Sequence, residues 1–303
     1  MTKIIQFIHP GVEHSIKSGK IWNSGNHKRK YLRVSGKYLS DFNNLPLVSD
    51  QIYFWGEWEA QANFSKIKNT IKNGPEYIFE PFFNLPAPIN AQNTDPFVFG
   101  NQYYYFICKQ PHYTSLRNLV AGDIILFGSS KNKQFVLDTV FIIKNKLPYK
   151  FSELTEFRKK YNSTFSEVGL GPLENSAFVP QKEIIFQDSF CIPISCDDKT
   201  DNYPVSGVND YYVYEAVMYE DREKFEGMFS YAPCLEGQPG GNGFARPVIN
   251  LPNIITPALN QGLKITETSI AKEIWRDVTS QVLTSNLEIM VENILPKQIS
   301  TLK

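Results

Sequence analysis

The segment 52–60 holds the residues best suited to chemistry, because it places aromatic side chains and two carboxylates within a predicted strand. Side chains alternate across a strand, so Trp55, Glu57 and Glu59 are predicted to share one face. Two carboxylates at this spacing could act as general acid and base, clamp a metal ion, or accept hydrogen bonds from a base beside a stacking indole. They could equally end the strand and pair with the basic run 28–30.

The N-terminal loop gathers imidazoles and cations: His9 and His14, then His27 and Arg29. Such a cluster could ligate a metal, hold a phosphate or move a proton. The spacing of His9 and His14 is not that of an H-E-x-x-H helix, so the sequence assigns no metal site and identifies no cofactor. Anion binding through His27 and Arg29 is the favoured function, and a merely polar loop is the alternative.

Two further turns could contribute to the same site. Asn93 and Asp95 lie in an Asn-Thr-Asp-Pro turn, where Asp95 is either a third carboxylate of the site or a turn residue. Arg246 ends the glycine-rich segment 238–246, which could form a backbone nest for an anion or be a surface loop. The segment lacks both the Walker A pattern and G-x-G-x-x-G. Because a neutral protein must gather its cations locally to hold an anion, Arg246 is predicted to face the N-terminal histidine loop.

Composition limits the classes of function. The chain has 303 residues, 42% of them hydrophobic, with 31 basic and 31 acidic residues. A neutral chain has no global field for DNA or an anionic membrane, so any nucleic-acid contact must use a local patch. Four scattered cysteines indicate neither a zinc ribbon nor a disulfide framework. No segment is apolar enough to span a membrane, which predicts a soluble, cytoplasmic protein.

The pattern of elements predicts an α+β, mainly β fold. Strands are expected at 3–8, 31–34, 52–58 and 77–83, and shorter strands follow residue 162. A hairpin is expected at 119–143 with a five-residue turn at 129–133, and Asp138 on its second strand is either at an edge or a buried acid with a partner. An amphipathic helix is predicted at 267–284. The candidate boundary near residue 150 divides the chain into a β-rich part, 1–150, and an α+β part, 151–303, which could pack as one body.

The hairpin carries a resemblance. Residues 119–128, Leu-Val-Ala-Gly-Asp-Ile-Ile-Leu-Phe-Gly, followed by a turn and an apolar strand, resemble the signature of PUA-like domains of the ASCH and EVE groups. The resemblance implies a small β-barrel in the N-terminal part that binds RNA or reads flipped, modified bases. It also places the hairpin 123–143 in one barrel-like sheet with the strand 52–58. The wider set of motifs resembles a bacterial protein family to which no activity is attached.

The first functional hypothesis is a binding protein for a nucleotide or nucleic acid, which recognises an extruded or modified base in a bacterial modification or defence pathway. Trp55 would stack on the base and Glu57 or Glu59 would accept hydrogen bonds from its edge. The phosphate would be held by His27, Arg29 or Arg246.

Two alternatives belong to other classes. The first is a metal-dependent hydrolase or nuclease, with Glu57, Glu59 and Asp95 as metal ligands or as acid and base, and with His9 or His14 as proton carrier. The second is a structural subunit that binds a protein partner through its aromatic surplus.

Overall fold

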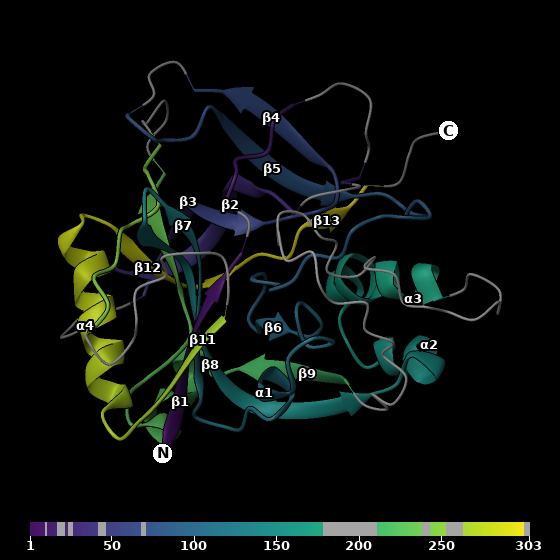
Figure 1. Cartoon of the computed structure of the whole chain (residues 1–303). Coiled ribbons are helices and arrows are strands. Elements are labelled where there is room, and N and C mark those ends of the chain that lie inside the picture. Colours follow the sequence, from purple (N-terminus) through teal and green to yellow (C-terminus); the bar gives the residue numbers. More distant parts are fainter. Residues whose placement is uncertain are drawn as a thin grey trace.

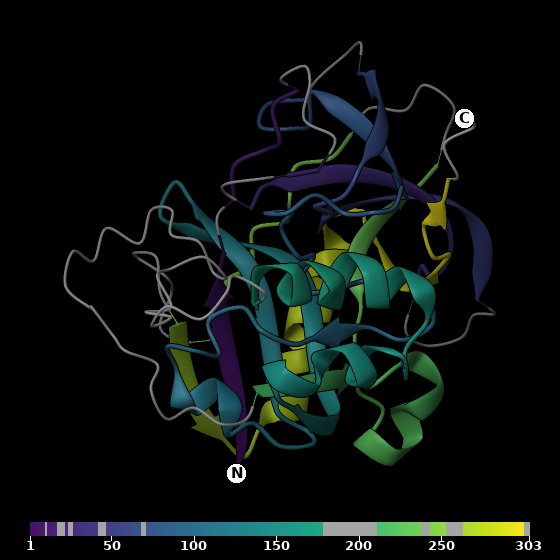
Figure 2. The same cartoon turned by 90° about the vertical axis from the view of Figure 1, so that its right-hand side faces the viewer.

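The computed structural model describes residues 1–9, 11–16, 22–23, 27–41, 47–67, 71–177, 211–237, 243–252 and 263–299. The described chain folds mainly into β-strands, in two sheets with helices at the flanks (Figures 1 and 2). The predicted predominance of β-structure is therefore confirmed. No helix in the described part is long and apolar enough to cross a membrane.

The first sheet has six strands in the order β11–β1–β7–β8–β9–β6. Only the β1–β7 pair is parallel, and the other pairs are antiparallel. The strands are β1 Thr2–Ile8, β6 Tyr104–Tyr105, β7 Ile124–Lys131, β8 Gln134–Tyr149, β9 Tyr211–Ala216 and β11 Leu263–Thr268.

The second sheet contains a small closed β-barrel. Its order is β12–β10–β3–β2–β5–β13, with β4 paired to β5, and β12 also pairs with β2. That extra pairing closes β2, β3, β10 and β12 into a ring, which leaves no free edge among them. The strands are β2 Arg29–Leu39, β3 Val48–Glu57, β4 Ala62–Lys66, β5 Tyr77–Phe83, β10 Ala232–Glu236, β12 Glu288–Asn293 and β13 Lys297–Gln298.

The helices lie at the flanks of the sheets, with α4 on one side and α2 and α3 on the other (Figure 1). Their bounds are α1 Thr114–Arg117, α2 Leu154–Arg158, α3 Gly171–Ala177 and α4 Ala271–Thr284. A π-helical turn, Phe165–Leu170, precedes α3, and 3₁₀ turns cover Phe151–Glu153 and Tyr219–Phe225. The helix α4 begins at Ala271 and not at the predicted position 267, because Glu267 and Thr268 belong to β11. Its buried side chains include Ile274, Trp275, Val278 and Val282.

Two hydrophobic cores lie on opposite faces of the strands. In β1, Ile4 packs in the core that contains the apolar side of α4, while Ile5 and Phe7 pack in the core that contains α2. Neighbouring residues of a strand point to opposite faces, so a strand that is apolar on both faces must be central. The apolar residues at positions 4, 5, 7 and 8 of β1 are thereby explained.

The predicted alternation along β3 is confirmed. Tyr53 and Trp55 pack in one core, and Phe54 and Trp58 pack in the other. The β2–β3 register runs without a shift past Gly56, so this glycine is not a bulge. A Cβ at Gly56 would lie 2.7 Å from Cε2 of Phe54, so close packing excludes a side chain there.

The predicted five-residue turn of the hairpin is wrong. Strand β7 continues through Lys131 and β8 begins at Gln134, so the loop has two residues, Asn132 and Lys133. Their φ angles are 53° and 62°, in the left-handed region that a type I′ turn requires at both central positions. The polar residues that suggested a longer turn belong to the strands.

The hairpin and the strand 52–58 do not share a sheet, which corrects the prediction from the resemblance. The hairpin strands β7 and β8 belong to the first sheet, and β3 belongs to the second. The physical reason is that both edges of β3 are occupied, by β2 and by β10. Strand β8 meets the second sheet through an isolated bridge between Val140 and Tyr231, directly before β10.

Both sheets combine strands from either side of residue 150. Strands β9 and β11 join the first sheet, and β10 and β12 complete the barrel of the second. The predicted parts 1–150 and 151–303 are therefore interleaved in both sheets.

Candidate metal centre

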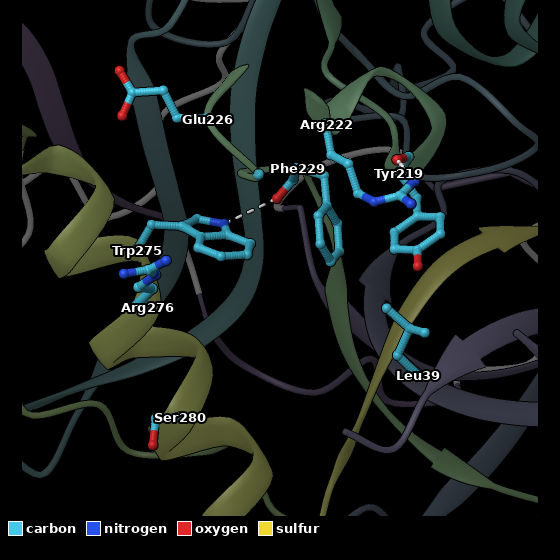
Figure 3. Close-up of a pocket in the computed structure, with 9 residues that line it drawn as sticks. Leu39, Tyr219, Arg222, Glu226, Phe229, Trp275, Arg276 and Ser280 are labelled. Atoms are coloured by element: carbon cyan, nitrogen blue, oxygen red, sulfur yellow. Dashed lines mark hydrogen bonds between the residues drawn. The ribbon is translucent and has the colours of Figure 1, made fainter. Parts of the chain in front are cut away.

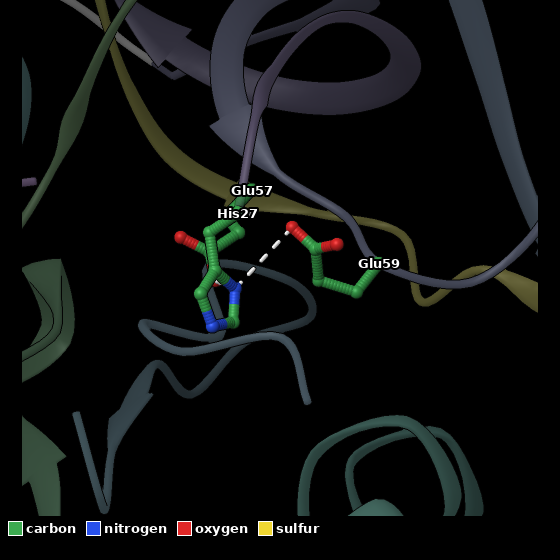
Figure 4. A group of neighbouring side chains, drawn as sticks. All are labelled: His27, Glu57 and Glu59. Carbon is green, nitrogen blue, oxygen red and sulfur yellow. Dashed lines mark ion pairs between the residues drawn. The ribbon is translucent and has the colours of Figure 1, made fainter. Parts of the chain in front are cut away.

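Three buried side chains converge where β2 begins and β3 ends (Figure 4). Nδ1 of His27 lies 2.8 Å from Oε1 of Glu57 and 3.5 Å from Oε1 of Glu59. One possible ligand atom from each residue lies within 4.8 Å of the others. His27 precedes β2 by two residues, Glu57 is the last residue of β3, and Glu59 lies two residues beyond it. The antiparallel pairing of β2 and β3 brings the three residues together.

The carboxylate of Glu59 is buried without hydrogen-bond partners. The residue is 0% exposed, and neither carboxylate oxygen accepts a hydrogen bond from the described residues. Its backbone is fixed, because its N–H donates to Oγ1 of Thr94 at 3.0 Å and its carbonyl accepts from the N–H of Asn23 at 2.8 Å. A buried carboxylate that accepts no hydrogen bond is expensive unless a cation offsets its charge, and the nearest cationic groups are the imidazole of His27, at 3.5 Å, and Lys30.

The contact between His27 and Glu57 is close but is not an aligned hydrogen bond. Although Nδ1 of His27 lies 2.8 Å from Glu57, it has no partner with hydrogen-bond geometry. Burial alone would lower the pKa of His27, but the carboxylates of Glu57 and Glu59 outweigh burial and raise it well above 6.5. Burial likewise opposes ionisation of Glu59, yet His27 and Lys30 hold its pKa below the usual value. The three groups therefore stabilise one another's charges.

A chain of buried ion pairs connects this cluster to the first sheet. Arg29 donates from Nη1 to Oε2 of Glu57 at 2.6 Å and from Nε to Oδ2 of Asp138 at 2.7 Å. Arg246 donates from Nη1 to Oδ1 of Asp138 at 3.3 Å and from Nη2 to the carbonyl of Gly11. The prediction that Arg246 faces the N-terminal loop is confirmed by that last contact. The residues 238–242 before it lie outside the described part.

These contacts decide the alternatives for Asp138. Asp138 is 3% exposed and binds both Arg29 and Arg246, so it is a buried acid with partners and not an edge residue. Arg29 was predicted to hold phosphate. In the structure its guanidinium is bonded to two carboxylates of the protein, those of Glu57 and Asp138. Arg29 thus orients Glu57 in this structure.

Lys30 is a buried cation next to Glu59. Its Nζ donates to the backbone carbonyls of Trp58 and of Ala60, the latter at 3.3 Å. Burial lowers the pKa of Lys30 to about 8, although Glu59 and Glu57 act in the opposite direction. Lys30 therefore holds the backbone on either side of Glu59 in place.

His9 lies between Glu57 and a cysteine that sequence reasoning did not connect with it. Its Nδ1 is 3.5 Å from Oε2 of Glu57, and its Nε2 is 2.9 Å from Sγ of Cys108. Burial, reinforced by Arg29 and His27, lowers the pKa of His9 well below 6.5. His9 is therefore a neutral imidazole beside the cluster.

Asp95 lies at the same cluster but is held by its own loop. Its carboxylate accepts hydrogen bonds from the backbone N–H groups of Phe106, Ile107 and Cys108, and its own N–H donates to Oε1 of Glu57 at 3.3 Å. Burial raises the pKa of Asp95 to about 7, against the effect of the three N–H groups. These bonds support the role of a turn residue more directly than that of a third ligand.

Trp55 is packed by protein groups. Its Nε1 donates to the carbonyl of Phe244 at 2.7 Å, and its ring lies 5.4 Å from that of Tyr31 and 5.6 Å from the guanidinium of Arg246. The residue is 5% exposed. A base could stack on Trp55 only after displacing these neighbours.

Asn93 and His14 form no described hydrogen bond or ion pair with Glu57 or Glu59, although the charge of Glu59 acts on His14. Asn93 is buried two residues before Asp95. The ring of His14 packs edge-on against Phe79, at 5.7 Å between centroids. Burial lowers the pKa of His14 to about 4, with a further contribution from Lys30.

The lowered pKa of His14 gives a testable pH dependence. An ordinary histidine binds a proton near pH 6.5, so between about pH 6.5 and 4 the unfolded chain binds more protons than the folded one. Stability is lost as the pH falls through this window, by at most about 1.4 kcal/mol per pH unit for one group. The replacement His14→Gln should flatten the pH profile of the free energy of unfolding, measured by urea denaturation at each pH. Parallel profiles of wild type and variant would contradict this.

The comparisons with protein-family models, with curated proteins and with solved structures find no match for this chain.

Proposed function

We propose that this chain is a metal-dependent hydrolase acting on nucleotides or nucleic acid, with His27, Glu57 and Glu59 as the metal ligands. The observation that carries the proposal is the carboxylate of Glu59, which is fully buried without a hydrogen-bond donor from the described residues and faces an imidazole and a second carboxylate. A set of three protein ligands is typical of catalytic sites, because it leaves one coordination position for water.

The donor set suits Zn²⁺ or Mn²⁺, which accept imidazole nitrogen together with carboxylate oxygen. A bound divalent ion would supply an activated water at neutral pH. Arg29, through its bond to Oε2 of Glu57, leaves Oε1 directed toward His27. Such an outer partner fixes the orientation of a ligand. Of the two predicted proton carriers, His9 is the better placed, at 3.5 Å from Glu57.

A metal ion at this centre would favour an anionic substrate. Arg29, Lys30 and Arg246 all belong to the same buried network. Glu57, Glu59 and Asp138 offset these three charges, so the excess positive charge that attracts a phosphate ester would come from the bound metal ion. This is a local effect, in keeping with a chain that is neutral overall.

The test is turnover with and without metal. Protein stripped with a chelator should be inactive on a panel of nucleotides and of single- and double-stranded nucleic acids, and Zn²⁺ or Mn²⁺ should restore hydrolysis, followed by mass spectrometry of the products. An ion that raises the melting temperature while no substrate on the panel is hydrolysed would contradict the enzymatic role and indicate a structural ion.

A second candidate is recognition of an extruded or modified base, as the resemblance to PUA-like domains implies. The observation in its favour is the small closed barrel of β2, β3, β10 and β12, whose strand β3 carries Trp55 and Glu57. Saturable binding of an intact nucleotide by metal-free protein, with no hydrolysis after metal is added, would favour this candidate over the hydrolase.

A further inference from the structure

A cavity of about 510 Å³ lies between α4 and the 3₁₀ segment Tyr219–Phe225 (Figure 3). None of its lining residues belongs to the metal centre. The volume lies within the range of about 300 to 1,000 Å³ that small-molecule sites occupy. The cavity is therefore large enough for a ligand of its own.

One wall of the cavity is a row of aromatic rings. The ring of Phe229 meets that of Tyr219 at 5.1 Å and that of Trp275 at 5.2 Å, both edge to face. Nε1 of Trp275 donates to the carbonyl of Phe229 at 3.0 Å, which fixes the indole. The wall is thus apolar and rigid before any ligand binds, which lowers the entropic cost of binding.

Two arginines, Arg222 and Arg276, also line the cavity. The guanidinium of Arg222 lies over the ring of Tyr219, 3.9 Å from its centroid, and Nη1 donates to the carbonyl of Tyr219 at 2.7 Å. Arg276 comes from α4 and is exposed. Glu226 also lines the cavity, but no ion pair with either arginine is found among the described residues. Two guanidinium groups without a carboxylate partner favour an anion.

We propose that this cavity binds a mononucleotide, a planar ring that carries a phosphate. The base would stack on the flat guanidinium of Arg222, which lies over Tyr219, because Phe229 and Trp275 are only 2% and 5% exposed. The phosphate would be held by Arg276, which lies on the other side of these rings (Figure 3), because a guanidinium fork matches phosphate oxygens. This site is separate from the metal centre and does not depend on the proposed hydrolase activity.

The experiment is calorimetric titration of the full chain with AMP, in chelator and in the Glu59→Gln background, so that the metal centre cannot contribute. We expect saturable binding that weakens at least about tenfold in Arg222→Gln, which loses the stacking guanidinium, and in Arg276→Gln, which loses one charge-assisted contact. The matched controls are Lys224→Gln and Lys272→Gln, which remove the same charge from the same two elements outside the cavity. Their affinities should equal that of the parent.

Adenosine and inorganic phosphate, titrated separately, distinguish the two halves of the ligand. Each should bind more weakly than AMP. Phosphate binding as tightly as AMP would overturn the aromatic part of the proposal. The whole proposal fails if AMP does not saturate the protein, or if the arginine variants, with melting temperatures like the parent, bind AMP as the lysine controls do.

Discussion

Replacing Arg29 by alanine will lower the free energy of unfolding by about 3 to 5 kcal/mol, the cost of removing one partner from a buried ion pair. Arg29 is 1% exposed and is bonded to Glu57 and to Asp138. Its loss removes the charge that links the two carboxylates and leaves Glu57 with His27 and Asp138 with Arg246 as their remaining charged partners. Equilibrium denaturation in urea measures the effect.

The matched control is Arg33→Ala on the same strand, β2. Arg33 pairs with Glu80, and both side chains are well exposed, at 39% and 43%. An exposed pair contributes about 0 to 1 kcal/mol, so this variant should stay close to wild type. If the Arg29 and Arg33 variants were equally stable, the buried network would not be holding the two sheets together.

Replacing Glu59 by glutamine will weaken binding of Zn²⁺ or Mn²⁺ by at least about 100-fold. Loss of a residue that only supports a ligand costs up to about 100-fold in metal affinity, and Glu59 is proposed as a ligand itself. Glutamine keeps the shape of the side chain but removes the charge that a metal ion would neutralise. The apo variant should be less stable than wild type near neutral pH, because His27 and Lys30 hold the pKa of Glu59 below its usual value and glutamine removes the charge that they stabilise. Competition against a metallochromic chelator gives the affinity, and thermal unfolding of apo protein gives the stability.

The control is Glu76→Gln, which removes a carboxylate from an exposed position. Its metal affinity should be that of wild type. Equal affinities in the Glu59 and Glu76 variants would show that any metal binds elsewhere on the chain.

The sequence predicted those parts of the structure that depend on local pattern. The alternation along β3 assigned Tyr53 and Trp55 to one face and Phe54 to the other, because side chains alternate with period two whatever the strand pairs with. Asp138 shares one face of its strand with apolar residues. The sequence therefore predicted that Asp138 lies either at the edge of a sheet or in the interior with a charged partner.

Contacts between distant segments could not be predicted in this way. The approach of His9 to Cys108 joins residues 99 positions apart, and that of Arg29 to Asp138 joins residues 109 positions apart. Such pairs depend on which strands neighbour one another, and the hairpin was assigned to the wrong sheet. The cluster of His27 with Glu57 and Glu59 was not identified as a metal site because the ligands come from two strand ends and show no motif spacing.

Anomalous diffraction from crystals grown with Zn²⁺ tests the metal centre most directly. We predict one strong peak at the zinc edge, about 2.0 to 2.2 Å from Nδ1 of His27 and from a carboxylate oxygen of each of Glu57 and Glu59. A map with no peak between these three residues, at a zinc concentration that saturates the protein in solution, would contradict it.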